Sequence, residues 1–171
     1  MRHSNIDISL TMLHILFGLI LLTYAAAAVK SPVIDDSCET HLSVLTECQG
    51  LISFSGECRS AIVNLTNTEY SQCDAVNFFW SYPLNNMTLI LDAPFTRSRQ
   101  AYSMDFDNDQ IMSGVSHVYR IFNNQETDVT THDANLVQYS DSNYQIILKF
   151  QGPSRLSRYG LNISYKSIKM F

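Results

Sequence analysis

Apolar and polar residues alternate over short stretches in most of the chain beyond residue 48. In "YQIILKF" (144–150) and "LNISYK" (161–166), apolar side chains occupy every second position, with polar residues at most of the positions between. A period of two indicates a β-strand with one buried face. Further short runs of strand-forming residues come earlier in the chain, at 50–54, 60–65, 76–82, 86–92, 101–106, 117–122 and 134–140.

These runs are separated by Gly, Pro, Asn, Asp and Ser at intervals of roughly ten residues, a spacing typical of all-β sandwiches and barrels. No sustained helical period follows residue 28. The pattern therefore predicts one antiparallel β-sandwich domain over 48–171. Residues 29–47 are polar apart from "HLSVL" (41–45), and we interpret them as an N-terminal arm, in which a helical turn is one option.

The first 28 residues have the layout of a secretory signal peptide. Arg2 and His3 give a weakly basic start, residues 13–22 are apolar, and the small residues of 23–28 suit cleavage after Ala28. We expect export to the extracellular space. The alternative is a segment retained as a membrane anchor, because the stretch from Leu10 to Val29 is about long enough to span a bilayer.

Charge and glycosylation motifs agree with an exported protein. The formal net charge is −5 and no long basic tract is present, which argues against binding to nucleic acid. Three N-x-S/T sequons begin at Asn64, Asn86 and Asn162, and each predicts a glycan on an exposed side chain. Asn86 and Asn162 fall on the polar faces of their predicted strands.

The four cysteines are Cys38, Cys48, Cys58 and Cys73. An even number in an exported chain predicts two disulfides, and three pairings are open. The intervals between successive cysteines are ten, ten and fifteen residues, too wide for the close cysteine pairs of a zinc site.

The order of these segments resembles a CUB domain. "CQGLISFSG" from Cys48 is similar to the opening of that family, and Cys73 leads into an aromatic strand at the family's spacing. "HVYRIFNN", "SDSNYQIILKF" and "RYGLNISYK" are similar to its later strands, so that the resemblance covers 48–166. It implies a jelly-roll sandwich of two antiparallel sheets with a Cys48–Cys73 disulfide. The family's second disulfide has no counterpart here, and we expect Cys38 to pair with Cys58 instead.

Many CUB domains bind partners through calcium, and this chain lacks the matching ligands. His117 stands where the first Asp is expected, Gln151 and Gly152 stand where the second is expected, and 110–116 offers no carboxylate. Calcium requires several oxygen ligands. The resemblance therefore implies no family metal site, and we expect no cofactor.

A second acidic motif also departs from a calcium loop. Asp105, Asp107 and Asp109 have the spacing of an EF-hand start, but Gln110 and Ser116 replace the required Gly and Glu. An exposed acidic turn is the favoured interpretation, and a calcium site of another type is the alternative.

We expect recognition rather than catalysis. No nucleophile-elbow motif is present, and the cysteines are expected to be oxidised. Candidate ligand-binding loops carry Arg97 and Arg99, and Arg155 and Arg158; if they adjoin, they form a basic site, and otherwise they are solvated loops. The sequence thus predicts a secreted binding module for an extracellular protein or glycan, with a self-associating structural protein as the alternative.

Overall fold

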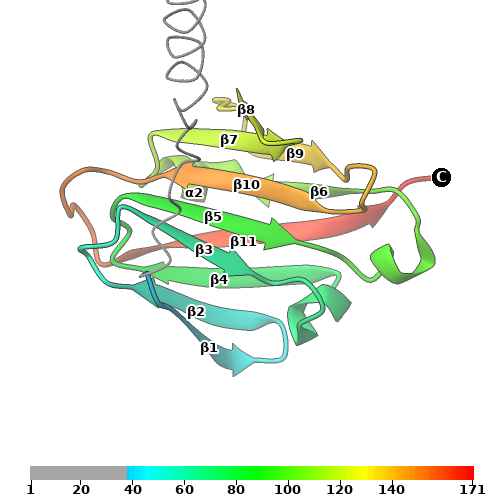
Figure 1. Cartoon of the computed structure of the whole chain (residues 1–171), viewed down its shortest axis with the longest axis horizontal. Helices are drawn as coiled ribbons and strands as arrows, with labels where there is room; N and C mark the ends of the chain where they lie inside the picture. The colour runs from blue at the N-terminus through cyan, green and yellow to red at the C-terminus, as the bar shows by residue number, and fades with distance from the viewer. Residues whose placement is uncertain (1–37) are drawn as a thin grey trace, which may run out of the picture. The chain divides into compact units, whose positions relative to one another are not determined.

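Two β-sheets pack face to face in the computed structural model, which describes residues 38–171 (Figure 1). In spatial order, sheet A contains β1 (Thr40–Thr46), β2 (Gln49–Phe54), β4 (Ala75–Ser81), β11 (Gly160–Lys169), β6 (Tyr102–Asp107) and β9 (Asn135–Tyr139). Sheet B contains β3 (Ser60–Asn64), β5 (Asn86–Leu91), β10 (Ile146–Gln151), β7 (His117–Phe122) and β8 (Gln125–Asp128). Short helices complete the fold: η1 (Glu69–Gln72), η2 (Thr96–Ser98) and α2 (Asn108–Met112).

The predicted all-β sandwich is confirmed, although the sheets are not wholly antiparallel. β2 pairs with β4 in parallel, and so does β3 with β5. The first strands alternate between the sheets, so that β2 and β4 run one way while β3 and β5 run the other. Strands that return to the same sheet therefore lie parallel, and the prediction of two purely antiparallel sheets is wrong at these two pairs.

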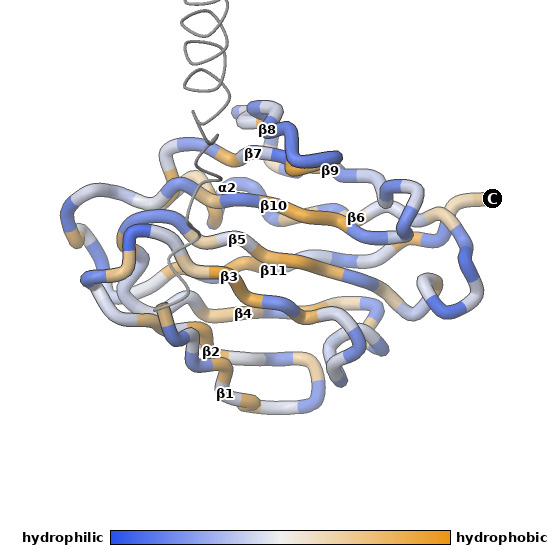
Figure 2. Tube along the Cα trace, in the orientation of Figure 1, coloured by the Kyte–Doolittle hydropathy of each residue, from blue (hydrophilic) through white to orange (hydrophobic). Residues whose placement is uncertain are grey.

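The alternating runs form the core as their pattern predicts. In β10, Ile146, Leu148 and Phe150 are completely buried, whereas Lys149 points outward. In β11, Ile163 is completely buried between the sheets, and the large Trp80 ring of β4 is buried as well. Figure 2 shows apolar residues concentrated along these inner strands and hydrophilic residues in β8 and the loops. Burial of this apolar surface is the main stabilising contribution to the fold.

Three elements differ from or add to the predicted set. Residues of the expected N-terminal arm form β1, which pairs with β2 from Thr40 opposite Phe54 to Thr46 opposite Gln49. No helical turn forms in the described part of the arm, because backbone pairing with β2 holds residues 40–46 extended. The structure also contains β8 and α2, which no hydrophobic pattern marks. The predicted signal peptide and residues 29–37 lie outside the described residues.

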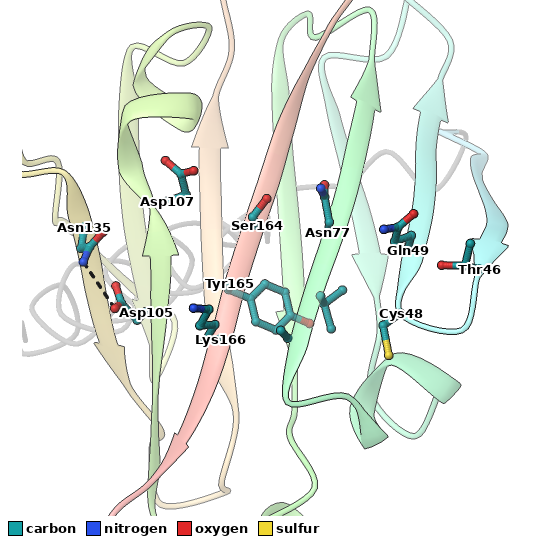
Figure 3. A pocket seen from close by; sticks show the side chains of 12 residues that line it. Thr46, Cys48, Gln49, Asn77, Asp105, Asp107, Asn135, Ser164, Tyr165 and Lys166 are labelled. Carbon is teal, nitrogen blue, oxygen red and sulfur yellow. Dashed lines mark hydrogen bonds between the residues drawn. The ribbon is translucent and has the colours of Figure 1, made fainter.

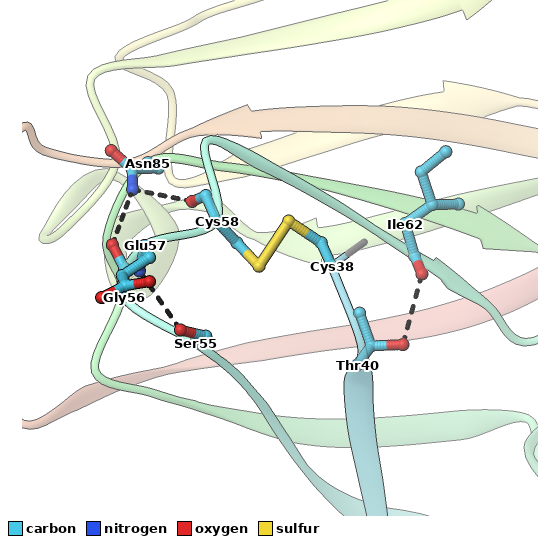
Figure 4. The surroundings of a disulfide bond; sticks show 8 residues. All are labelled: Cys38, Thr40, Ser55, Gly56, Glu57, Cys58, Ile62 and Asn85. Atoms are coloured by element: carbon cyan, nitrogen blue, oxygen red, sulfur yellow. Dashed lines mark hydrogen bonds between the residues drawn. A yellow bond between two sulfur atoms is a disulfide. The ribbon is translucent and has the colours of Figure 1, made fainter. Parts of the chain in front are cut away.

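A disulfide lies at each end of the sandwich. Cys48 and Cys73 are bonded just before β2 and β4, which start at the same end, with Cα atoms 5.9 Å apart. Cys38 and Cys58 are bonded near the starts of β1 and β3 at the opposite end, with Cα atoms 5.5 Å apart (Figure 4). The Cys48–Cys73 pairing is the one that the family resemblance implies, and Cys38–Cys58 is the pairing expected for the two remaining cysteines.

Among residues 38–171, no helix is long and apolar enough to cross a membrane.

Candidate binding surfaces

Hydrogen bonds join three loops at the end that contains Cys38 and Cys58. Asn85, between β4 and β5, is the common partner: its side-chain amide donates to the carbonyl oxygens of Gly56 and Cys58 at 3.3 and 2.8 Å (Figure 4). Its backbone NH donates to the carbonyl of Pro153 at 3.2 Å, and its carbonyl accepts from the NH of Gly152 at 2.6 Å. These bonds fix the loops after β2, β4 and β10 relative to one another.

Large side chains are exposed on this hydrogen-bonded frame. Tyr82, Leu156 and Tyr159 are 54%, 53% and 80% exposed. The Tyr82 and Tyr159 rings meet edge to face with centroids 6.1 Å apart, and the NH of Tyr82 donates to the carbonyl of Tyr159 at 2.8 Å. Arg155 and Arg158 are exposed on the same loop. These five residues are called the tyrosine patch below.

Backbone conformation around the patch is unusual. Tyr82 and Asn85 both have positive φ, 51° and 61°. Asn tolerates this left-handed region, whereas a bulky side chain adopts it at a cost of about 1–3 kcal/mol. The surrounding loop bonds therefore hold Tyr82 in a strained conformation with its ring facing solvent. Arg99 and Tyr144 at the opposite end also have positive φ, 51° and 59°, so that this conformation does not by itself mark the patch as functional.

The structure does not bring the four candidate arginines together. Arg97 and Arg99 follow β5, whereas Arg155 and Arg158 follow β10. β5 and β10 are antiparallel neighbours, so that the loops after them leave opposite ends of the sandwich (Figure 1). The loops do not adjoin, so the condition for a joint basic site is not met. Arg158 instead donates to the Ser113 hydroxyl at 2.6 Å, within the end that bears the tyrosine patch.

The sequons lie on outward faces of the two sheets. Asn86, opposite Gln151 in β10, is on the outer face of sheet B, and Asn162 is on the outer face of sheet A, opposite Phe79. Asn64 is exposed at the end of β3, where its side-chain oxygen accepts from the NH of Thr66 at 3.0 Å. Asn86 and Asn162 are half-buried, and glycosylation of the three sites stays a prediction.

A polar groove of about 560 Å³ crosses the outer face of sheet A (Figure 3). Carboxylates, amides, hydroxyls and one amine face it from neighbouring strands. Within it, the Asn135 amide donates to Asp105 at 3.4 Å. This mixture of donors and acceptors suits a polar ligand rich in hydroxyl groups. The side chains that give the groove this character are those of Thr46, Gln49, Asn77, Asp105, Asp107, Asn135, Ser164 and Lys166.

The acidic motif at 105–109 divides between this groove and α2. Asp105 and Asp107 face the groove, while Asp109 is exposed on the helix. Asp107 also caps α2, because its side chain accepts from the NH of Gln110 at 3.3 Å. Within 38–171, no three His, Cys, Asp or Glu side chains are grouped so as to hold a metal ion.

His117, which stands where the CUB resemblance would place a calcium-binding Asp, forms a hydrogen-bonded pair with Asp128. Its Nδ1 lies 3.1 Å from a carboxylate oxygen of Asp128, and both side chains are about half exposed. Hydrogen bonds from the Thr130 hydroxyl and NH lower the pKa of Asp128, with a smaller contribution from His117. The pair connects β7 to β8 at the edge of sheet B.

The opposite end of the sandwich is closed by buried polar contacts. Asp92 is only 6% exposed, and one of its oxygens accepts from the NH of Asn67 at 3.1 Å. Burial raises the pKa of Asp92, and the hydrogen bond from Asn67 opposes that shift. Beside it, the Tyr102 hydroxyl and the Thr96 hydroxyl both donate to the carbonyl of Tyr144, at 2.9 and 3.1 Å.

No protein-family model matches the chain, and no curated protein matches it. The two-sheet sandwich is compatible with a CUB-like jelly roll.

Proposed function

We propose that this protein is a secreted, glycosylated, CUB-like module that binds an extracellular protein or glycan through the tyrosine patch, without catalysis. The observation that carries the proposal is the exposure of Tyr82, Leu156 and Tyr159 on loops that hydrogen bonds hold together. Tyr and Arg are the residue types that contribute most often to binding hot spots. A rigid sandwich with functional loops is a common plan for recognition domains.

The chemistry of the patch indicates what kind of group it recognises. Arg155 and Arg158 are exposed beside the two tyrosines, in a chain whose net charge is −5. Guanidinium groups pair with carboxylates and sulfates in a planar, two-pronged geometry, and they also stack on aromatic rings. We therefore propose a partner with anionic groups, either acidic side chains of a protein or sulfates of a glycan.

Preorganisation favours binding by this end. Asn85 already connects the loops around the patch, so that little loop entropy is lost when a partner binds. The Cys38–Cys58 disulfide further restrains the neighbouring loop 55–59. Two disulfides and outward-facing sequons support the extracellular setting of the proposal.

The proposal is tested by affinity measurements with matched variants. A glycan array and cross-linking to extracellular fractions would identify the ligand, and its affinity would then be measured for Arg155→Ala/Arg158→Ala and for Arg97→Ala/Arg99→Ala. We expect the first pair to weaken binding by about thirtyfold, equivalent to about 2 kcal/mol. The second pair removes the same charge at the opposite end, and we expect a change within about twofold. Equal losses would contradict recognition by the tyrosine patch.

One observation favours self-association as a second candidate function. β1 is an edge strand of sheet A without Asp, Glu, Lys or Arg, and Val44 and Leu45 on it are 56% and 58% exposed. Uncharged edges can pair with another sheet. Light scattering over a concentration series would show growing assemblies that Leu45→Lys disperses, whereas a constant monomer mass would exclude this function.

A further inference from the structure

We propose that the polar groove on sheet A holds the first sugars of the glycan attached to Asn162 of the same chain. This inference rests on the proposed glycosylation of Asn162, and it assigns the groove a ligand class and a source. The register of β11, the space around Asn162 and the chemistry of the groove each support it.

The strand register places Asn162 in line with the groove. In β11, Asn162, Ser164 and Lys166 project from the same outer face because side chains repeat with a period of two. Ser164 and Lys166 line the groove, and Asn77 lies beside Ser164 on β4. From Asn162 to Lys166 the strand advances by about 13 Å. A saccharide chain running along β11 from Asn162 therefore enters the groove directly.

The alternative direction along the strand is blocked. The Phe79 ring covers Gly160 on the outer face, so closely that a Cβ atom on Gly160 would collide with it. Gly160 and Asn162 are same-face neighbours on β11, and Phe79 is the cross-strand partner of Asn162. The ring thus bounds Asn162 on the side away from the groove. It also offers an apolar surface against which the first sugar can pack.

The groove offers the hydrogen-bonding groups that sugars require. Asp105 and Asp107 accept bonds from hydroxyl groups, while the amides of Gln49, Asn77 and Asn135 both donate and accept. One oxygen of Asp105 is buried and makes no hydrogen bond within the protein. Its other oxygen accepts only the long bond from Asn135, at 3.4 Å. The Asp105 carboxylate lines the groove, and this second oxygen retains capacity to accept a further hydrogen bond.

The glycan at Asn86 provides an internal control. Asn86 projects from the outer face of sheet B, and its same-face neighbours on β5 are Thr88 and Ile90. The branched apolar side chain of Ile90 contributes no hydrogen bond to a sugar. A glycan there is expected to extend into solvent.

The test uses the full chain secreted from cells that attach short, uniform glycans. Glycopeptide mass spectrometry first measures occupancy at Asn162 and Asn86. An endoglycosidase that cuts between the first two sugars is then applied to the native protein. We expect cleavage at Asn162 to be about tenfold slower than at Asn86, which corresponds to about 1.4 kcal/mol of docking free energy. After reduction and unfolding, the two rates should be equal.

A second readout separates docking from simple shielding of the cleavage site. Trimming the glycan at Asn162 should lower the melting temperature by about 3 °C, because docked sugars stabilise the fold, whereas trimming at Asn86 should leave it unchanged. The variant Asn77→Ala/Lys166→Ala alters the groove without altering the sequon. It should bring the cleavage rate at Asn162 to within about twofold of the rate at Asn86. Gln49→Ala replaces this variant if it does not fold, with a smaller shift in the same direction.

The possible failures are distinguishable. An unoccupied Asn162 would overturn both this inference and the proposed glycosylation of that site. An occupied Asn162 that is cleaved as fast as Asn86 would overturn docking alone. Slow cleavage with an unchanged melting temperature after trimming would also overturn it, because the glycan would then be shielded rather than bound.

Discussion

The two ends of the sandwich have a disulfide each, yet they differ in what their loops do with large and polar side chains. At the Cys48–Cys73 end, polar groups turn inward: Asp92 is buried, and the Tyr102 hydroxyl is bonded to the backbone of Tyr144. At the Cys38–Cys58 end, hydrogen bonds between loops leave aromatic rings outside, with Tyr159 80% exposed. The first end buries polar groups beneath its loops, and the second holds exposed aromatic rings on loops that are hydrogen-bonded to one another.

This difference indicates that stability and recognition are separated in space. The loops of the tyrosine patch are joined by hydrogen bonds of the Asn85 backbone and side chain. The exposed side chains of the patch can therefore be substituted while the core stays intact. Substitutions at the two ends should therefore have effects of different kinds. The predictions below test this separation, beginning with the largest effect.

Removal of the Cys48–Cys73 disulfide should cost about 3.5 kcal/mol of unfolding free energy, because it releases a loop of 25 residues in the unfolded chain. Urea denaturation of Cys48→Ser/Cys73→Ser measures the loss. Cys38→Ser/Cys58→Ser should cost a similar amount of unfolding free energy. The molecules of this variant that remain folded should also bind ligand more weakly, because loop 55–59 is freed. Equal binding by the two folded variants would argue against the contrast between the ends.

Tyr159→Ala should reduce ligand affinity by about thirtyfold, or about 2 kcal/mol, because it removes the most exposed ring of the tyrosine patch. Its effect on unfolding free energy should stay within about 0.5 kcal/mol, since the side chain is largely solvated. Tyr139→Ala is the matched control: Tyr139 is 59% exposed on β9, outside the patch. Titration calorimetry should show a normal affinity for that variant, and a comparable loss would contradict the assignment.

Asp92→Asn should make the unfolding free energy less dependent on pH. Burial raises the pKa of Asp92 in the folded protein, so the folded state takes up a proton before the unfolded state does. The unfolding free energy of the native protein should therefore rise relative to that of the variant as pH falls from neutral through this titration. Thermal melts of both proteins at a series of pH values measure the difference. A difference independent of pH would contradict a raised pKa.

Tyr82→Asn and Tyr82→Ala should differ by about 1 kcal/mol in unfolding free energy, the smallest of these effects. Both lose the aromatic contact with Tyr159, but Asn accommodates the φ of 51° and Ala does not. Both variants should bind ligand weakly. If Asn is no more stable than Ala in chemical denaturation, Tyr82 is not held under strain.

Much of the fold was predictable because its strands are half buried. Alternation correctly marked strands such as β10 and β11, in which Leu148 and Ile163 face the core. The pattern failed where burial is weak: every residue of β8 is exposed, and most of β1 is exposed at a sheet edge. α2 spans Asn108–Met112, too few residues to show a helical period.

The candidate site was less predictable because it depends on topology. Arg97 and Arg155 belong to loops that look alike in sequence, and only the antiparallel pairing of β5 and β10 places them at opposite ends. Tyr159 could have been noted as an aromatic residue in a predicted loop, but its contact with Tyr82 joins segments far apart in the chain. The groove of sheet A likewise combines outward-facing residues of several strands. Its concave shape therefore could not be predicted from the sequence of any single strand.

Hydrogen-exchange mass spectrometry of the ligand-bound protein tests most directly whether recognition occurs at one end of the sandwich. We predict slower exchange in the loops 82–85 and 152–159 when ligand is bound, with no change in 92–101 at the other end. Protection of 92–101, or of the outer face of sheet A, without protection of 152–159 would contradict the account.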